Sequence, residues 1–189
     1  MKRMIYLGSV LCSLAPSAVL ADLRYNAFDA NFVDIEIDSG RTNVDGDGIE
    51  LGGSYELNDK FFLLGRWQDQ DLDLGIDGRV LEIGAGLHHP LSETMDFVGT
   101  LSYLDTELDA GNLSADDSGL AIGGGIRARV AEAVEIDASL KLIDFDDSGS
   151  DTGVTLGGRY YFSDTMAVGV GLDFSDDADT LRIGFRAEF

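Results

Sequence analysis

Apolar and polar residues alternate with a period of two along most of the chain. In the stretch VEIDASLKL, residues 134–142, every second residue is apolar and those between are charged or small. The same alternation recurs in GIELGGSYEL (48–57), RVLEIGAGLHH (79–89) and LAIGGGIRARV (120–130). Successive side chains of a β-strand point to opposite faces, so this pattern predicts strands with one apolar and one polar face.

The alternating segments and the turns between them predict ten strands. Short turns rich in polar residues alternate with longer connections rich in Asp, Gly and Ser, which we expect to be loops of about five to ten residues. A count of eight, with one hairpin merged or lost, is the alternative. We expect the strands at roughly 24–37, 48–57, 61–70, 79–89, 96–105, 119–130, 134–144, 153–162, 166–174 and 180–189.

The first predicted strand is the least regular. Its apolar face switches from the even-numbered Phe28, Ala30 and Phe32 to the odd-numbered Val33, Ile35 and Ile37. A β-bulge inserts one extra residue and would shift the phase in this way. We therefore expect a bulge near residue 33.

Either a soluble antiparallel sandwich or a transmembrane barrel could show this alternation. The polar face is rich in glycine and in charges of both signs, with few of the Thr and Lys residues that usually face solvent. Aromatic residues lie near the strand ends on the apolar face, as at the two interfaces of a membrane. We therefore predict an all-β fold, an antiparallel up-and-down transmembrane β-barrel whose last strand pairs with the first. The predicted aromatic girdle comprises Tyr55, Phe61, Trp67, Phe97, Tyr103, Tyr160, Phe162 and Phe174.

Residues 1–21 have the features of an export signal. Lys2 and Arg3 precede an apolar stretch, and VLA at 19–21 supplies small residues for cleavage before Asp22. The predicted mature chain, 22–189, is a single barrel domain. It has no cysteine, because Cys12 is the only one in the sequence, so it can form no disulfide.

The chain is strongly acidic. It contains 35 acidic and 13 basic residues, and loss of the two basic residues of the signal leaves a formal charge of 11 − 35 = −24. Such a charge argues against a nucleic-acid partner, whose phosphates it would repel. We expect the excess negative charge to lie in the long loops and at the adjoining strand ends.

Assigning charges to faces by the period-two rule predicts a nearly neutral barrel interior, with seven basic and seven acidic side chains. Small barrels often fill their interior with paired side chains, whereas the same charges could line a narrow water-filled pore. The sequence leaves both alternatives open. The predicted lumen-lining charges are Glu50, Glu56, Arg66, Glu82, Arg127, Arg129, Glu135, Asp137, Lys141, Arg159, Asp173, Arg182, Arg186 and Glu188.

The chain resembles the small OmpA/OmpX-like outer-membrane β-barrels of Gram-negative bacteria over its whole predicted mature length. The resemblance rests on the export signal, the alternating strands, the two kinds of connection and the final strand LRIGFRAEF (181–189). It implies location in the outer membrane and contact with outer-membrane lipid, including lipopolysaccharide. It also implies that the barrel-assembly machinery reads a signal formed by Leu181, Ile183, Phe185 and Phe189.

The acidic loops allow two interpretations. Asp, Gly and Ser form turns and keep loops soluble, but a ring of carboxylates could also hold Mg²⁺ or Ca²⁺ against anionic lipid. The stretches 69–78 and 144–151 lack the complete ligand pattern of a calcium loop. We expect weak, non-selective divalent binding at most, with no dedicated metal site and no cofactor.

We expect no enzymatic activity. Family resemblance includes small barrels that are hydrolases, acyltransferases or proteases, but the only histidines here are His88 and His89, beside Pro90 and near Ser92. The period of two places His88 in the lumen and His89 on the outer face, so their side chains diverge. Two function classes remain: a narrow diffusion channel, and a plugged structural or interaction barrel. A closed barrel has no free edge, which is compatible with a monomer.

Overall fold

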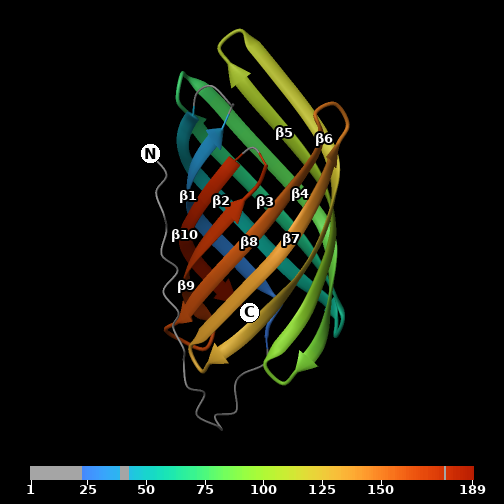
Figure 1. Ribbon diagram of the computed structural model, residues 1–189. Coiled ribbons are helices and arrows are strands. Elements are labelled where there is room, and N and C mark those ends of the chain that lie inside the picture. Colours follow the sequence, from blue (N-terminus) through green and yellow to red (C-terminus); the bar gives the residue numbers. More distant parts are fainter. Residues whose placement is uncertain (1–22, 39–42, 177) are drawn as a thin grey trace, which may run out of the picture.

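The computed structural model describes residues 23–38, 43–176 and 178–189. These residues form ten antiparallel strands that close into one barrel, in which each strand pairs with its sequence neighbours and β1 pairs with β10 (Figure 1). The predicted fold is confirmed, and the eight-strand alternative is wrong. The strands are β1 Ala27–Asp38, β2 Asn43–Asn58, β3 Phe61–Leu72, β4 Ile76–Ser92, β5 Met95–Ala110, β6 Leu113–Ala131, β7 Val134–Phe145, β8 Gly149–Tyr161, β9 Met166–Phe174 and β10 Ala178–Glu188.

The strand register defines a strongly tilted barrel. The row of paired residues that starts at Arg129 on β6 and passes through every strand returns to β6 at Asp117. The shear is therefore 129 − 117 = 12 residues for ten strands. With the usual strand spacings, this shear corresponds to a tilt of about 40°. In the described part of the chain, no helix is long and apolar enough to cross a membrane.

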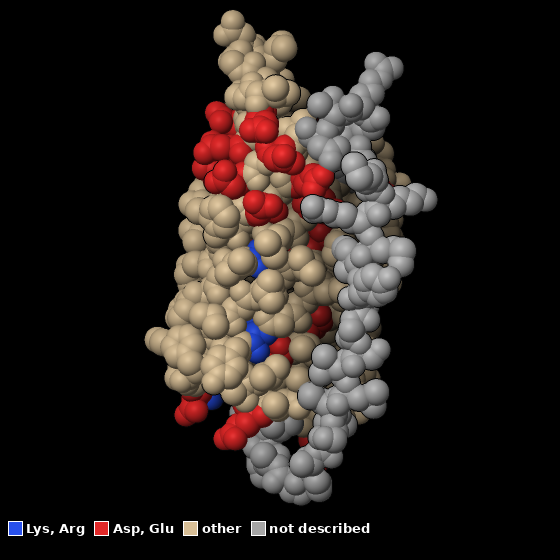
Figure 2. Space-filling model, turned by 60° about the vertical axis from the view of Figure 1, so that its left-hand side comes forward, with Lys and Arg blue, Asp and Glu red and all other residues tan. Residues whose placement is uncertain are grey.

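The outer face of the barrel is apolar over a broad belt. Side chains such as Val170 and Leu140, in the middle of their strands, are 51% and 57% exposed. Figure 2 shows this belt as a surface almost free of charged residues, with carboxylates gathered above it. An apolar surface of this extent is typical of a lipid-facing barrel wall.

Glycines on the inner face make room for long side chains of the neighbouring strands. A Cβ atom at Gly157 would lie 2.5 Å from a carboxylate oxygen of Asp137, and one at Gly86 would collide with the ring of Phe62. Both glycines have side chains of the adjacent strand lying across them. The alternation of glycine with large residues therefore allows a barrel of this size to contain many Arg, Glu and aromatic side chains.

The upper end of the barrel, where β1 joins β2 and β5 joins β6, differs from the prediction. The strands continue beyond the predicted limits, and the β5–β6 connection comprises only residues 111–112. The expected loops of about five to ten residues are therefore wrong. Much of the acidic sequence assigned to loops forms strand, including Asp45, Asp47 and Asp109.

The expected bulge in β1 is also wrong. The pairing of β1 with both neighbours is continuous from Ala27 to Ile37, so Val33 and Ile35 point into the lumen, where they are 0% and 4% exposed. The register shifts lie elsewhere, between Glu56 and Asn58 and at two similar positions near the opposite, lower end. The apolar residues of β1 therefore change from the outer face to the inner face because the surroundings of the strand change, whereas the strand itself is regular.

This change of environment extends around the barrel. Within the belt the strands have apolar residues outside and polar residues inside, but above it the arrangement reverses. Inward-facing Leu72 and Leu104 are buried there, whereas the adjacent Asp71 and Asp105 are exposed on the outer face. The upper part of the barrel is therefore built like a soluble barrel, with an apolar interior and a charged exterior.

Candidate functional site

The fourteen predicted lumen charges all lie on the inner face of the barrel. Thirteen of them separate into two groups, one toward each end. The lower cluster consists of Arg127, Arg129, Glu135, Asp137, Arg159, Arg186 and Glu188, joined by Asp29. The upper cluster consists of Glu50, Arg66, Glu82, Lys141, Asp173 and Arg182. Glu56 lies apart from both clusters, beside His88.

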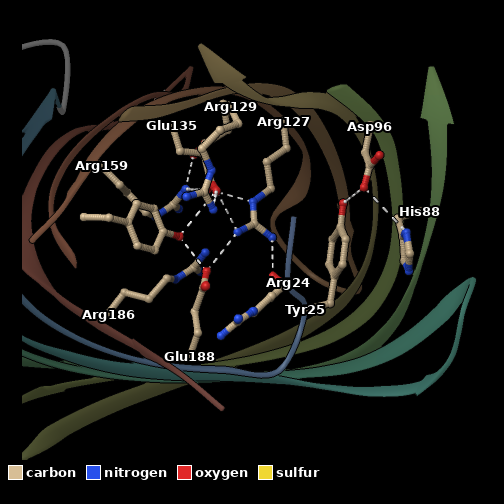
Figure 3. A network of polar contacts seen from close by, with 12 residues as sticks. Arg24, Tyr25, His88, Asp96, Arg127, Arg129, Glu135, Arg159, Arg186 and Glu188 are labelled. Carbon is tan, nitrogen blue, oxygen red and sulfur yellow. Dashed lines mark hydrogen bonds and ion pairs between the residues drawn. The ribbon is translucent and has the colours of Figure 1, made fainter. Parts of the chain in front are cut away.

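Glu135 is at the centre of the lower cluster, and its side chain is completely buried (Figure 3). Arg127 donates to both of its oxygens, from Nε at 2.7 Å and from Nη2 at 3.0 Å. Arg159 and Arg129 donate to the same carboxylate at 2.9 and 3.4 Å. Three guanidinium groups from β6 and β8 therefore converge on one carboxylate of β7.

Other carboxylates neutralise the remaining charge of these arginines. Glu188, from the end of β10, accepts hydrogen bonds from the Tyr161 hydroxyl at 2.5 Å and from Arg127 at 3.3 Å. On the same strand Arg186 forms a two-pronged pair with Asp29 of β1, with both distances 2.8 Å. With Asp29 included, the lower cluster has four acidic and four basic side chains and is formally neutral.

The upper cluster is balanced in the same way, with three side chains of each sign. Arg66 bridges Glu50 and Glu82, with nitrogen–oxygen distances of 3.2 and 2.9 Å. Lys141 reaches across from β7 to both oxygens of Glu82, at 2.8 and 2.9 Å. Arg182 pairs with Glu50 and also with Asp173. Charges buried in this way are tolerated because each one has an oppositely charged partner with hydrogen bonds.

A cavity of about 400 Å³ lies within the barrel between the two clusters. Its wall includes Arg66, Lys141 and Arg182 of the upper cluster and Asp137 and Arg159 of the lower cluster. We call this space the central chamber. Because its walls carry both signs of charge close together, it is suited to water and small polar solutes more than to apolar molecules.

The segment before β1 reaches across the lower lumen. Tyr25 is 4% exposed, and its ring stacks on His88 of β4 at 4.0 Å and on Phe62 of β3 at 5.0 Å between ring centres. Its hydroxyl donates to Asp96 of β5 at 2.8 Å. Arg127 of β6 lies over the same ring at 5.0 Å. Tyr25 therefore contacts four strands, none of which is a neighbour of β1.

The upper end of the barrel carries carboxylates on its outer face in register from strand to strand. Asp34 pairs with Asp47, which pairs with Asp71, and the row continues through Asp77 to Asp109. We call these five residues the carboxylate row. Like charges opposite one another in a sheet repel and weaken the pairing. In the described part of the chain, no group of three His, Asp, Glu or Cys residues could hold a metal ion.

At the same end Asp117 ties the β7–β8 turn to β6. Its carboxylate accepts hydrogen bonds from the backbone N–H groups of Ser148 at 2.9 Å and Asp147 at 3.2 Å, and from that of Ser118 at 2.8 Å. These hydrogen bonds lower the pKa of Asp117 because they stabilise its charged form, and Ser148 makes the largest contribution.

The other predicted site residues lie on the outer face. Phe61, Phe97 and Tyr160 are 41–56% exposed, and Trp67 has the same outward phase on β3. The remaining girdle residues are also exposed and outward: Tyr55, Tyr103, Phe162 and Phe174. Leu181, Ile183 and Phe185 face outward on β10, with Phe189 after its end. The predicted signal, 1–21, lies outside the described residues.

Tyr25, Asp29 and Asp96 also lie in the lumen, although they were not among the residues predicted from the sequence. Asp29 lies between the outward-facing Phe28 and Ala30, so the period of two alone would have assigned it inward. Likewise Asp96 directly precedes the outward-facing Phe97. Tyr25 lay within the predicted first strand, 24–37, but it precedes the observed strand, and its position depends on contacts with distant strands that the sequence pattern does not show.

A closed antiparallel barrel with an apolar outer belt and a charged, hydrogen-bonded interior defines a transmembrane β-barrel. Solved structures of this class are similar to the chain. The β-domain of the Bordetella autotransporter BrkA is 11% identical with a TM-score of 0.56, and the match covers 87% of this chain and 99% of that one. The translocator domain of the autotransporter NalP from Neisseria meningitidis is 8% identical with a TM-score of 0.50, covering 87% and 88%.

The NanC porin gives a TM-score of 0.49 at 10% identity, covering 87% of this chain and 95% of that one. No protein-family model and no curated protein sequence matches the chain. At these identities the structural similarity establishes the fold alone.

Proposed function

We propose that the chain is a porin-like, integral outer-membrane β-barrel that contains a narrow channel for small polar solutes. The observation that carries this proposal is the central chamber of about 400 Å³, whose walls combine Arg and Lys side chains with carboxylates. Charged side chains that line a narrow pore allow water and ions to enter and determine which ions pass. Tyr25, Arg127 and Arg159 line the lower part of the chamber, and we expect the channel to be narrowest at this end.

The apolar belt and the resemblance to small Gram-negative barrels support the outer membrane as the location. In this orientation the upper end faces the outside of the cell, and the start of β1 and the end of β10 lie on the periplasmic side. The outward phase of Leu181, Ile183 and Phe185, with Phe189 after them, is compatible with recognition of β10 by the barrel-assembly machinery. We propose no catalytic role: His88 faces carboxylates and an aromatic ring inside the lumen, whereas His89 is exposed outside.

Planar-bilayer recordings of two matched variants test the channel. Glu50→Gln and Arg182→Gln each remove one charge from an ion pair with a nitrogen–oxygen distance of 3.1 Å at the chamber wall. In a salt gradient we expect Glu50→Gln to shift the reversal potential toward anion selectivity and Arg182→Gln toward cation selectivity. Opposite shifts are expected because fixed charges in a narrow pore attract ions of the opposite sign.

A folded, inserted barrel that gives no current steps in the native form, in both variants and in Tyr25→Ala, which lacks the side chain below the chamber, would contradict the channel. Folding would be checked by the β-sheet signal in circular dichroism. Equal reversal potentials in conducting native and variant proteins would also count against a pore that passes through the chamber.

The carboxylate row favours a second candidate, a structural or interaction barrel. It lies directly above the apolar belt and faces outward, at the height expected for lipid headgroups (Figure 2). We propose that divalent cations relieve the repulsion within the row and bridge it to the anionic headgroups of lipopolysaccharide. A silent barrel in the experiment above would make this candidate the leading one.

A further inference from the structure

We propose that the segment Leu23–Asn26 is a removable plug that closes the periplasmic mouth of the channel, and that Phe62, His88, Asp96 and Arg127 form its receptor site. This inference rests on the proposed channel function. It concerns a part of the chain that belongs neither to the barrel wall nor to the two charge clusters.

The path of the chain places this segment inside the barrel. The first strand begins at Ala27, and Asn26 still contacts the wall. Its carbonyl accepts a hydrogen bond from the backbone N–H of Phe189 at 3.1 Å, and its side-chain oxygen accepts one from the backbone N–H of Glu56 at 2.8 Å. From there Arg24 and Tyr25 turn toward the far wall. The carbonyl of Arg24 accepts a hydrogen bond from Nη1 of Arg127 at 2.6 Å (Figure 3).

β6 is the strand opposite β1 in a ring of ten, so this hydrogen bond spans the mouth of the barrel. The segment therefore crosses the lumen directly beneath the central chamber, and Tyr25 contributes to the chamber floor. A solute that leaves the chamber downward would meet Tyr25 and the guanidinium group of Arg127.

The receptor site matches Tyr25 in shape and in chemistry. Two aromatic rings, Phe62 and His88, provide stacking surfaces, and Asp96 accepts a hydrogen bond from the Tyr25 hydroxyl. His88 is itself held between two carboxylates, with Nε2 at 3.3 Å from Glu56 and Nδ1 at 3.6 Å from Asp96. Stacked aromatic pairs contribute modestly, whereas a charge-assisted hydrogen bond is among the stronger hydrogen bonds and fixes the position of the hydroxyl.

The plug can leave its site without breaking the barrel. β1 pairs with β2 and β10 from Ala27 onward, and these ladders do not depend on Arg24 or Tyr25. The seated and released positions of Arg24 and Tyr25 thus form a two-state element whose populations are set by the contacts of these two residues. Loss of those contacts shifts the population toward the open channel.

Conductance of the Tyr25→Ala variant, purified in its membrane-inserted form, tests the plug. We expect the fraction of time open to rise by roughly tenfold or more relative to the native protein, because the variant lacks the stack and the hydrogen bond to Asp96. Tyr160→Ala is the matched control: it removes a tyrosine near the same end, but from the outer face, where that residue is 56% exposed. The control should conduct like the native protein.

A second measurement is independent of conductance. Trypsin cleaves after arginine, and the carbonyl of Arg24 is the group bound by Arg127, so the seated plug should resist cleavage at this bond. The receptor variants His88→Ala and Asp96→Asn leave the sequence of the plug intact. We expect both to be cut between Arg24 and Tyr25 roughly tenfold faster than the native protein, with the new N-terminus identified by mass spectrometry.

The outcomes separate the plug from the channel. If Glu50→Gln and Arg182→Gln shift selectivity but folded Tyr25→Ala conducts like the native protein, the plug is wrong and the channel stands. If all variants are silent but the receptor variants are cleaved faster, the segment occupies its site in a barrel that is no channel. Cleavage at the native rate in both receptor variants would refute the receptor site.

Discussion

Glu135 illustrates at the residue scale how this barrel tolerates charge in its interior. Its carboxylate has no exposed surface, yet three guanidinium groups approach it within 3.4 Å. Removing one partner of a buried ion pair leaves the others uncompensated, which usually costs more than the pair itself contributes. Glu135 should therefore be the most sensitive charge in the lower cluster.

We predict that Glu135→Gln lowers the free energy of unfolding by about 3–5 kcal/mol, because the isosteric amide leaves three arginines without their shared negative charge. Urea unfolding of the barrel in lipid vesicles would measure the change. Glu107→Gln is the control, since the Arg79–Glu107 pair is 2.9 Å long but about half exposed. The Glu107→Gln substitution should lower the free energy of unfolding by about 1 kcal/mol or less. Similar small losses in both variants would indicate that the lumen around Glu135 is filled with water.

At the scale of elements, the β3–β4 hairpin has an unusual turn. Leu74 has a φ of 71° and is followed by Gly75 with a φ of 70°. Two successive residues with positive φ are typical of a type I′ turn, where Asn, Asp or Gly is usual at the first position. The Leu74 side chain is 84% exposed, so no packing compensates for the left-handed backbone.

Leu74→Asn should therefore stabilise the hairpin, by about 0.5–1 kcal/mol, since asparagine tolerates the left-handed region better than leucine does. The free energy of unfolding would be measured as for Glu135→Gln. Leu113→Asn is the matched control: Leu113 is also a highly exposed leucine next to a turn, at 77%, but has no positive φ. Equal effects of the two substitutions would show that lost apolar exposure, and not backbone strain, causes any gain.

At the scale of the whole molecule, the reversal of polarity along the strands marks the upper boundary of the lipid-facing belt. Below it, outward positions are apolar, as at Val170 in the middle of β9. Above it, outward positions carry the carboxylate row, and inward positions such as Val33 and Leu72 are buried and apolar. Both patterns follow from the same physical rule, because apolar side chains face whichever side excludes water.

This boundary can be tested with two lysines on the outer face. Val170→Lys should destabilise the barrel in lipid bilayers by about 2–4 kcal/mol, the cost expected for a basic residue near the middle of the membrane. Asp34→Lys lies above the belt and opposite Asp47, so it should be neutral or slightly stabilising. Comparable destabilisation by both lysines would place the belt boundary elsewhere.

The sequence by itself determined the ten strands and, within the membrane belt, which side chains face inward. The reason is local: the pleat of a strand sends alternate residues to opposite faces, so Glu135 and Arg127 could be assigned to the lumen without knowledge of their partners. The near balance of lumen charge followed from the same rule. Asp29 and Asp96 were missed because the rule was not carried through the first strand and the start of the fifth.

Only the tertiary structure decided what these side chains meet. The switch of the apolar face at Val33 would look the same in the sequence if the strand contained a bulge or if a regular strand left the membrane. The continuous register of β1 shows that the strand is regular. The receptor site of Tyr25 depends on residues 88, 96 and 127, which come together only when the tilted sheet closes into a barrel. Contacts across a barrel are set by shear and closure, and these are properties of all ten strands together.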